Sequence, residues 1–140
     1  MKKTKVIACI FVLVFLFVST TFSSFAIAKE DDFSADGFEC SILVAHTSSR
    51  ARTTAEIVNM SGSAANVRIV STCAVEYTND WQVETDANQA TLANRNSLDA
   101  ELEVIYYGGF VNAVCGEHTF VVDGEELITL AIDMYYGVDF

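Results

Sequence analysis

The stretch Val67–Tyr77, with the sequence VRIVSTCAVEY, decides the fold of this chain of 140 residues. Its odd-numbered positions carry apolar or small side chains, namely Val67, Ile69, Ser71, Cys73, Val75 and Tyr77. Arg68 and Glu76 lie between them. Because successive side chains of a β-strand point to opposite faces, this period of two predicts a strand with one buried and one solvated face. The β-branched residues of the stretch favour the same structure.

The same alternation extends outward from this stretch in both directions. Further strands are expected over residues 38–44, 53–60, 100–106 and 127–136, and residues 110–122 are expected to form one long strand or two short ones broken near Gly116. The turn sequences between them are Ser48-Ser49-Arg50, Ser61-Gly62-Ser63, Gly108-Gly109 and Asp123-Gly124. Gly-Gly and Asp-Gly are typical of tight hairpins. Thr78–Ser97 is mostly polar, and we expect a long connection there with one short strand near Gln89–Leu92.

Six to eight strands in a chain of this length predict an all-β fold, and the two-faced alternation favours an antiparallel β-sandwich. A small β-barrel is the alternative. The likeness to an immunoglobulin domain is one of architecture only, because the hallmarks of that fold are missing. Trp81 lies 41 residues beyond Cys40 instead of shortly after it, and Ala113 replaces the tyrosine expected two residues before Cys115.

The N-terminus has the layout of a cleavable signal peptide, which we expect to be helical. Three lysines at positions 2, 3 and 5 precede the apolar run Val6–Val18, and a polar stretch then leads to Ala26-Ile27-Ala28. Signal peptidase requires small residues at the first and third positions before the cut, so cleavage is expected between Ala28 and Lys29. The 13 apolar residues are fewer than the roughly 20 that span a bilayer, which argues against a stable membrane anchor.

Removal of residues 1–28 leaves a strongly acidic chain. The full sequence has 8 basic and 19 acidic residues and a net charge of −11 at pH 7. The expected mature chain keeps 5 basic and all 19 acidic residues, for a net charge of −14. Such a surface repels phosphates and anionic lipids, so nucleic acid and membrane surfaces are not expected partners. We expect residues 29–37 to be a flexible acidic leader and residues 38–140 to be a single β domain.

Three cysteines remain in the expected mature chain, and they are Cys40, Cys73 and Cys115. An exported protein meets an oxidising environment, so one disulfide among them is a candidate, with the pairing open. The alternative is that all three are buried thiols that act as small apolar side chains.

Candidates for catalysis or zinc binding are few. Glu117-His118 and the nearby Cys115 form a candidate zinc set together with His46, and a cysteine paired with either histidine is a candidate nucleophile. Neither set has the close ligand spacing that such sites usually show. The alternative places His118 on a strand face with Phe120 and Val122, partly buried or at an edge. We therefore expect no catalytic residues.

Two acidic runs are candidate calcium ligands. Glu30-Asp31-Asp32 and Asp123–Glu126 supply carboxylate oxygens, but neither has the spacing of an EF-hand loop. The alternative is that the first belongs to the solvated leader and the second to a solvated turn. We expect neither a metal nor a cofactor.

Aromatic residues are candidate binding groups. Trp81, Tyr77, Tyr107 and Tyr135 can stack on the apolar face of a sugar ring or fill a pocket on a protein. Neighbouring residues of a strand point to opposite faces, so one tyrosine of each adjacent pair is expected outside the core. The alternative is ordinary packing in the core and at its rim.

These features predict a non-catalytic β module that is secreted or surface-associated and binds a protein or a glycan. The layout is typical of small exported proteins of Gram-positive bacteria. A secreted effector, such as a small toxin, a bacteriocin-like factor or an inhibitor, is a second hypothesis. A metal-dependent or thiol hydrolase is a third. The sequence does not predict the oligomeric state.

Overall fold

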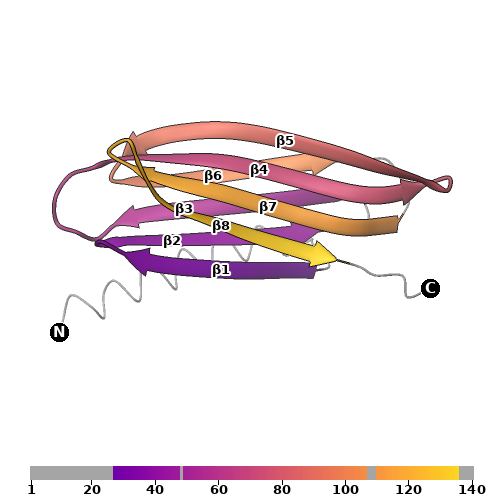
Figure 1. The fold of residues 1–140 in the computed structure, drawn as a ribbon, viewed down its shortest axis with the longest axis horizontal. Helices are drawn as coiled ribbons and strands as arrows, with labels where there is room; N and C mark the ends of the chain where they lie inside the picture. The colour runs from indigo at the N-terminus through magenta and orange to yellow at the C-terminus, as the bar shows by residue number, and fades with distance from the viewer. Residues whose placement is uncertain (1–26, 48, 107–109, 136–140) are drawn as a thin grey trace.

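The computed structural model describes residues 27–47, 49–106 and 110–135, and nearly all of them lie in β-strands (Figure 1). The eight strands are β1 (Ile27–Ala35), β2 (Phe38–His46), β3 (Arg50–Asn59), β4 (Asn66–Asn79), β5 (Gln82–Arg95), β6 (Ser97–Ile105), β7 (Phe110–Val122) and β8 (Glu125–Tyr135). This confirms the predicted all-β fold. Among the described residues, no helix is long and apolar enough to cross a membrane.

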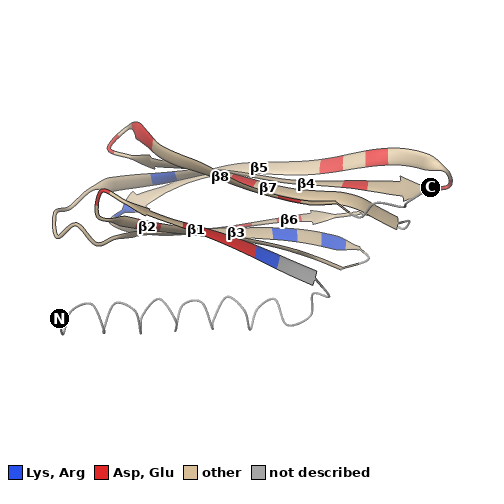
Figure 2. Ribbon diagram, turned by 60° about the horizontal axis from the view of Figure 1, so that its bottom comes forward, with Lys and Arg blue, Asp and Glu red and all other residues tan. Residues whose placement is uncertain are grey.

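The strands form two antiparallel sheets that face each other as two layers (Figure 2). One sheet has the order β1-β2-β3-β6 and the other the order β5-β4-β7-β8. No strand of one sheet pairs with a strand of the other among the described residues, so the arrangement is sandwich-like. The run β1-β2-β3 is a meander within one sheet, which differs from the strand order of an immunoglobulin domain.

The core fills the space between the layers and follows the predicted alternation. Val67, Ile69, Cys73 and Val75 of β4 are at most 1 % exposed, and Arg68 faces solvent on the other side of the sheet. Strands β2, β3, β6, β7 and β8 add alternate side chains to the same apolar cluster. The stretch that predicted the fold is thus a central strand of the second sheet.

The two layers are in close contact where Gly116 of β7 faces β2 and β3. A Cβ atom at this position would lie 2.4 Å from Cγ2 of Val44 and 2.6 Å from Oγ1 of Thr53. These separations are far below van der Waals contact, so the opposite sheet already occupies the space of a side chain. The position therefore requires glycine for steric reasons, although its backbone is ordinary.

Residues 29–37 form most of β1 and the turn after it, which corrects the expected flexible leader. β1 pairs with β2 in an unbroken register from Ile27–His46 to Ala35–Phe38. Asp36 and Gly37, with φ of 53° and 79°, make the tight turn between them. Phe33 packs against the core and so anchors the strand to the domain. The charged residues around Phe33 mask the apolar pattern by which this contact could have been predicted. The expected signal peptide lies outside the described residues except for Ile27 and Ala28, which begin β1.

Residues 78–97 contain a second departure from expectation, because most of them form the long strand β5. This strand pairs with β4 over its whole length, from Gln82–Asn79 to Arg95–Asn66. Twelve of its 14 side chains are exposed, so neither face shows the apolar alternation by which a half-buried strand is recognised. The expected Asp123-Gly124 hairpin does connect β7 and β8. The expected Gly108-Gly109 turn lies outside the described residues.

The close approach at Gly116 can be tested by adding one methyl group. Gly116→Ala should lower the free energy of unfolding by about 2–3 kcal/mol, because Val44 and Thr53 must move to admit a Cβ atom. Denaturant unfolding followed by circular dichroism measures the change. Glu117→Ala, at the next and exposed position, is the control and should change the stability by less than about 0.5 kcal/mol. Equal stability of Gly116→Ala and the unmodified protein would contradict the packing described above.

Candidate functional site

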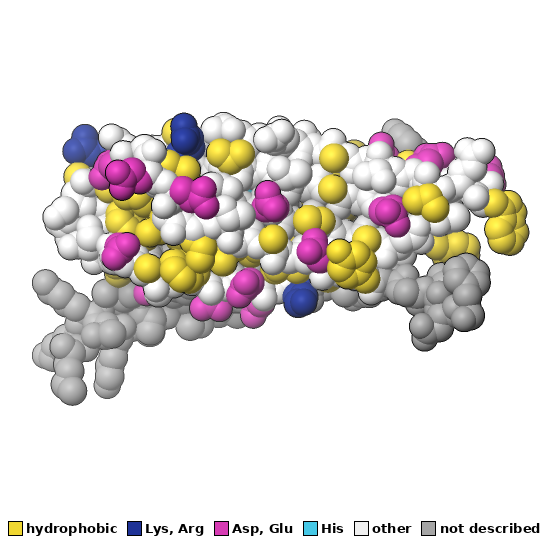
Figure 3. Space-filling view, in the orientation of Figure 1, with side chains coloured by type: hydrophobic (Ala, Val, Ile, Leu, Met, Phe, Trp, Pro, Cys, Tyr) yellow, Lys and Arg dark blue, Asp and Glu magenta, His cyan; other side chains and the backbone are white. Residues whose placement is uncertain are grey.

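Most of the exposed large hydrophobic side chains among the described residues lie toward one end of the sandwich, with Ile105 on the first sheet and the others on the second sheet or its β4–β5 hairpin. Six large hydrophobic residues are exposed among those described, and the five at this end are Trp81, Val83, Ile105, Phe110 and Tyr135. The end of β6, the start of β7 and the end of β8 are directed toward this side of the molecule, and the β4–β5 hairpin projects beyond β6 and β8 (Figure 1). Hydrophobic side chains are visible at this end of the molecular surface (Figure 3). We call these five residues the aromatic end.

Trp81 is the most exposed of the five. Its side chain is 99 % exposed at the tip of the β4–β5 hairpin. Asp80 and Trp81 have φ of 46° and 67°, in the left-handed region that residues other than glycine seldom adopt. Each such residue costs on the order of 1 kcal/mol, and the indole gains no burial within the chain in return. The hairpin therefore presents Trp81 to solvent at a cost in stability.

Strand register places the neighbouring residues in one row. Thr78 of β4 pairs with Val83 of β5 on one side and with Phe110 of β7 on the other. Paired residues of antiparallel strands point to the same face, so Val83 and Phe110 both lie on the outer face of this sheet. A β-bulge between Glu76 and Tyr77 shifts the β4–β7 register just before this row and brings Phe110 opposite Thr78. Two apolar side chains thus flank Thr78 on the outer face of the three strands.

The aromatic residues that the sequence suggested as binding groups differ in their exposure to solvent. Trp81 and Tyr135 are exposed, Tyr135 by 76 %, and Tyr107 lies outside the described residues. Tyr77 is only 4 % exposed, and its ring centroid lies 5.1 Å from that of Tyr106. Tyr77 is therefore part of the core beneath the aromatic end and does not belong to the exposed surface. Phe110, which the sequence reasoning omitted, does belong to it, since it directly follows the expected Gly-Gly turn.

The hydroxyl of Tyr77 makes a polar contact at the edge of the core. It lies 2.9 Å from a carboxylate oxygen of Glu84 and 2.9 Å from one of Asp86, both on β5. The hydrogen bond to Glu84 and then that to Asp86 raise the pKa of the Tyr77 hydroxyl above its ordinary range. These contacts tie the start of β5 to the core and so support the hairpin that carries Trp81.

His118 shares a strand face with Phe120, as the alternative interpretation expected, but it lies in the core instead of at an edge. It is fully buried, with Nδ1 2.8 Å from Ser71 Oγ and Nε2 2.6 Å from Thr53 Oγ1. Thr53 Oγ1 donates to the carbonyl oxygen of Leu43 at 3.0 Å, so it accepts a hydrogen bond from Nε2–H of His118. Nδ1 then accepts from the Ser71 hydroxyl. Both ring nitrogens therefore form hydrogen bonds inside the core, and these bonds link β7 to β3 and β4. Burial lowers the pKa of His118 to about 4.

The structure does not assemble the candidate zinc set. Glu117 points to the outer face of its sheet and is exposed, whereas His118 points into the core. His46 is the last residue of β2, which belongs to the other sheet, and its Nδ1 lies 3.1 Å from the Thr47 carbonyl oxygen. No group of three or more His, Cys, Asp or Glu side chains could hold a metal ion in the described part of the chain.

The candidate disulfide is not formed, because the three thiols are free and lie in different environments. Cys40 of β2 and Cys73 of β4 are fully buried in the core. Cys115 of β7 is partly exposed and pairs with Asp133 of β8. Burial is the main cause that raises the pKa of each thiol to about 12, so all three are protonated at neutral pH. The alternative interpretation of the cysteines as small apolar residues describes Cys40 and Cys73 best.

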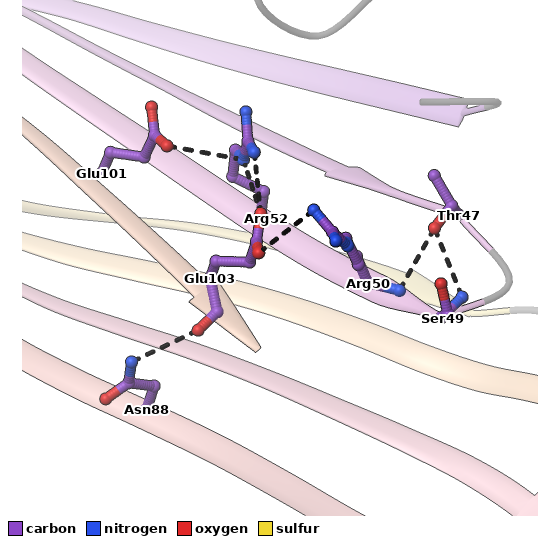
Figure 4. Close-up of polar contacts among 7 residues, drawn as sticks. All are labelled: Thr47, Ser49, Arg50, Arg52, Asn88, Glu101 and Glu103. Carbon is purple, nitrogen blue, oxygen red and sulfur yellow. Dashed lines mark hydrogen bonds and ion pairs between the residues drawn. The ribbon is translucent and has the colours of Figure 1, made fainter. Parts of the chain in front are cut away.

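Ion pairs on the first sheet join β3 to β6 (Figure 4). Arg52 contacts Glu103 at 2.7 Å and Glu101 at 3.5 Å, and Arg50 contacts Glu103 at 3.7 Å. Asn88 of β5 also donates to the backbone carbonyl oxygen of Glu103. The arginines therefore neutralise acidic neighbours on the adjacent strand, which is a structural role.

The two acidic runs that were candidate calcium ligands lie in a strand and a turn. Glu30, Asp31 and Asp32 belong to β1, where successive side chains alternate between faces. In the β7–β8 turn, Asp123 Oδ1 accepts a hydrogen bond from the backbone N–H of Asn66 at 2.8 Å. Acidic residues are spread over both sheets, as Figure 2 shows.

The aromatic end differs from these arrangements because its side chains make no comparable contribution to the fold. The histidine network, the thiols and the ion pairs all have partners or packing within the chain. Neither a scan of protein-family models nor a search of curated proteins gives a match to this sequence. The aromatic end is accordingly the candidate site on structural grounds.

The buried histidine predicts a pH dependence of stability. The unfolded chain binds a proton at His118 near pH 6.5, whereas the folded chain does so only near pH 4. Stability should therefore fall as the pH drops from 6.5 to 4, by up to about 3 kcal/mol. Glu56 acts in the opposite direction, because burial, with Asp99 and Glu39 nearby, raises its pKa to about 7.

A variant without the histidine network isolates the contribution of His118 to the pH dependence of the unfolding free energy. Thr53→Val, Ser71→Ala and His118→Leu together replace the network by apolar groups and leave Glu56 in place. The unfolding free energies of both proteins, measured by denaturant titration between pH 7.5 and 4.5, should differ increasingly in favour of the variant as the pH falls. Parallel pH profiles would show that His118 is not held neutral by burial.

The thiols can be counted chemically. In denaturant without reductant, iodoacetamide should label Cys40, Cys73 and Cys115, because none is in a disulfide. In the native protein, labelling should be slow at all three, with Cys115 reacting first because it alone is partly exposed. Peptide mass spectrometry measures both patterns. A disulfide-linked peptide pair from the unreduced protein would contradict the structure.

Proposed function

We propose that the protein is an exported, non-catalytic β module that binds a protein or a glycan through its aromatic end. The observation that carries this proposal is the fully exposed Trp81, held at a hairpin tip by strained backbone beside Val83 and Phe110. The export part rests on the signal-like N-terminus of the sequence.

The position of the aromatic end supports a binding role. In sandwich domains with immunoglobulin-like architecture, the connections at one end of the two sheets form a common binding surface. Here the end of β2, the start of β3, the β4–β5 hairpin, the end of β6 and the start of β7 all lie toward the end that carries Trp81. Strained backbone tends to occur where function requires a particular presentation of a side chain.

The chemistry of the surface narrows the class of partner. Tryptophan and phenylalanine offer large rigid faces that stack on sugar rings or enter apolar pockets, and tryptophan is prominent among interface hot spots. The net charge of −11 disfavours anionic partners. We therefore propose a neutral or cationic protein surface, or an uncharged glycan, as the ligand.

Trp81 is the only tryptophan, so its fluorescence reports directly on the site. In the free protein the emission should be that of a solvated indole and should change little on unfolding, because the side chain is 99 % exposed. Titration with glycans that score on an array, or with purified proteins from the bacterial surface, should shift the emission to the blue. A free protein whose emission is already that of a buried indole would refute the proposed site.

Substitution tests the same site independently. Trp81→Ala should weaken binding of the ligand found in that titration at least tenfold, a loss of about 1.4 kcal/mol or more, while the unfolding free energy stays within about 0.5 kcal/mol. Leu92→Ala is the matched control, because Leu92 is the exposed large hydrophobic residue remote from the aromatic end. Isothermal titration calorimetry measures both affinities. Equal weakening by the two substitutions would argue against a site at Trp81.

A further inference from the structure

Among the described residues the two sheets have four edge strands, and these differ in how they are protected. The edges are β1 and β6 in one sheet and β5 and β8 in the other. An edge strand offers free backbone N–H and C=O groups, so proteins usually protect it with charges, proline, bulges or covering groups. Proline is not used here, because the sequence contains none.

Three of the edges carry such protection. β1 has four consecutive charged residues, Lys29 to Asp32. β8 carries Glu125, Glu126 and Asp133, and its pairing with β7 is interrupted by a register shift. β6 is covered by asparagines of β5, because Asn88 donates to the carbonyl oxygen of Glu103 at 3.3 Å and Asn94 to that of Ser97 at 3.0 Å.

β5 lacks these devices over most of its length. Its 14 residues pair with β4 without any register shift, so the strand is long and regular. The central segment Ala87–Asn94, with the sequence ANQATLAN, contains no charged residue. Most of its side chains are small and exposed, and would not keep another backbone away. The strand lies at the margin of the molecule (Figure 1), and no other strand pairs with its second edge among the described residues.

We propose that β5 pairs with β5 of a second copy of this chain, antiparallel across a twofold axis, to form one continuous eight-stranded sheet. Charge along the strand favours this occupant and this direction. Glu84 and Asp86 lie in the first half of β5, whereas the second half carries Arg95 and no acid. Antiparallel pairing sets the acidic half of each copy against the other half of its partner. Parallel pairing would set Glu84 and Asp86 beside their own copies.

The pairing would also arrange the aromatic ends. Trp81 precedes β5 directly, so antiparallel strands would place the two Trp81 side chains at opposite ends of the continuous sheet. The dimer would then be bivalent. The inference stands apart from the proposed binding function, because the dimer forms along the edge of β5 and leaves both ends free.

Sedimentation equilibrium of the purified protein tests the proposal. We expect a monomer–dimer equilibrium with a dissociation constant in the micromolar range. The equilibrium should shift toward the dimer as NaCl rises from about 0.05 to 0.5 M, because salt screens the repulsion between two acidic molecules. Hydrogen exchange of the amides in Ala87–Asn94 should slow as protein concentration rises. A protein that stays monomeric at about 200 µM in 0.5 M NaCl would overturn the proposal.

A pair of lysine variants provides the control. Gln89 and Ala131 are exposed on the same face and lie in one cross-strand row, Gln89–Thr72–Glu117–Ala131, which runs from β5 to β8. Gln89→Lys places two like charges near the centre of the paired strands and should raise the dimer dissociation constant at least about tenfold. Ala131→Lys adds the same charge at the other edge and should not raise it. Unchanged dimerisation of Gln89→Lys, or equal loss in both variants, would overturn pairing through β5.

Discussion

The arrangement of the whole domain depends on the contact between Gly116, Thr53 and His118 at the centre of the two layers. The sheets can approach this closely because Gly116 has no side chain, and the approach brings Thr53 within hydrogen-bonding distance of the buried imidazole. A buried polar group costs free energy unless its partners are in place. A slip of β7 by one residue would move His118 to the outer face and Glu117 into the core. The contact therefore specifies the register as well as the packing.

The register fixed in the core also positions the surface at the end of the sandwich. Because β4 pairs with β5 and β7 in a defined register, Val83, Thr78 and Phe110 form a row that no local sequence signal joins. Tyr77, one residue before Thr78, points inward and holds Glu84 of β5. Adjacent residues of one strand thus serve the core and the outer surface in turn. Trp81 follows at the tip, where the chain has to reverse, and its exposure is a consequence of that turn.

The strands could be predicted from the sequence where their side chains alternate against a single core, and they could not where this alternation is missing. The buried faces of β2, β4 and β6 were predicted because each shows a period of two, and the hairpin at Asp123-Gly124 follows from its turn residues. β5 was missed because an edge strand exposed on both faces has no apolar alternation. β1 was missed because Phe33, which packs against the core, stands among acidic neighbours in the sequence. Trp81 was a candidate from its residue type, whereas the place of Phe110 beside it depends on a bulge that has no sequence signature.

The acidic composition of the chain and the uncharged centre of β5 together determine which edges of the sheets can associate. Repulsion between copies of a protein with 19 acidic and 8 basic residues is screened beyond about 10 Å at moderate salt, so close contacts decide which surfaces can meet. Contact through β1 or β8 would bring carboxylates against carboxylates. The centre of β5 carries no charge, and its asparagines already satisfy β6 on the inner side. Negative charge thus protects β1 and β8 against association and the asparagines of β5 cover β6, which leaves the regular edge of β5 for backbone pairing.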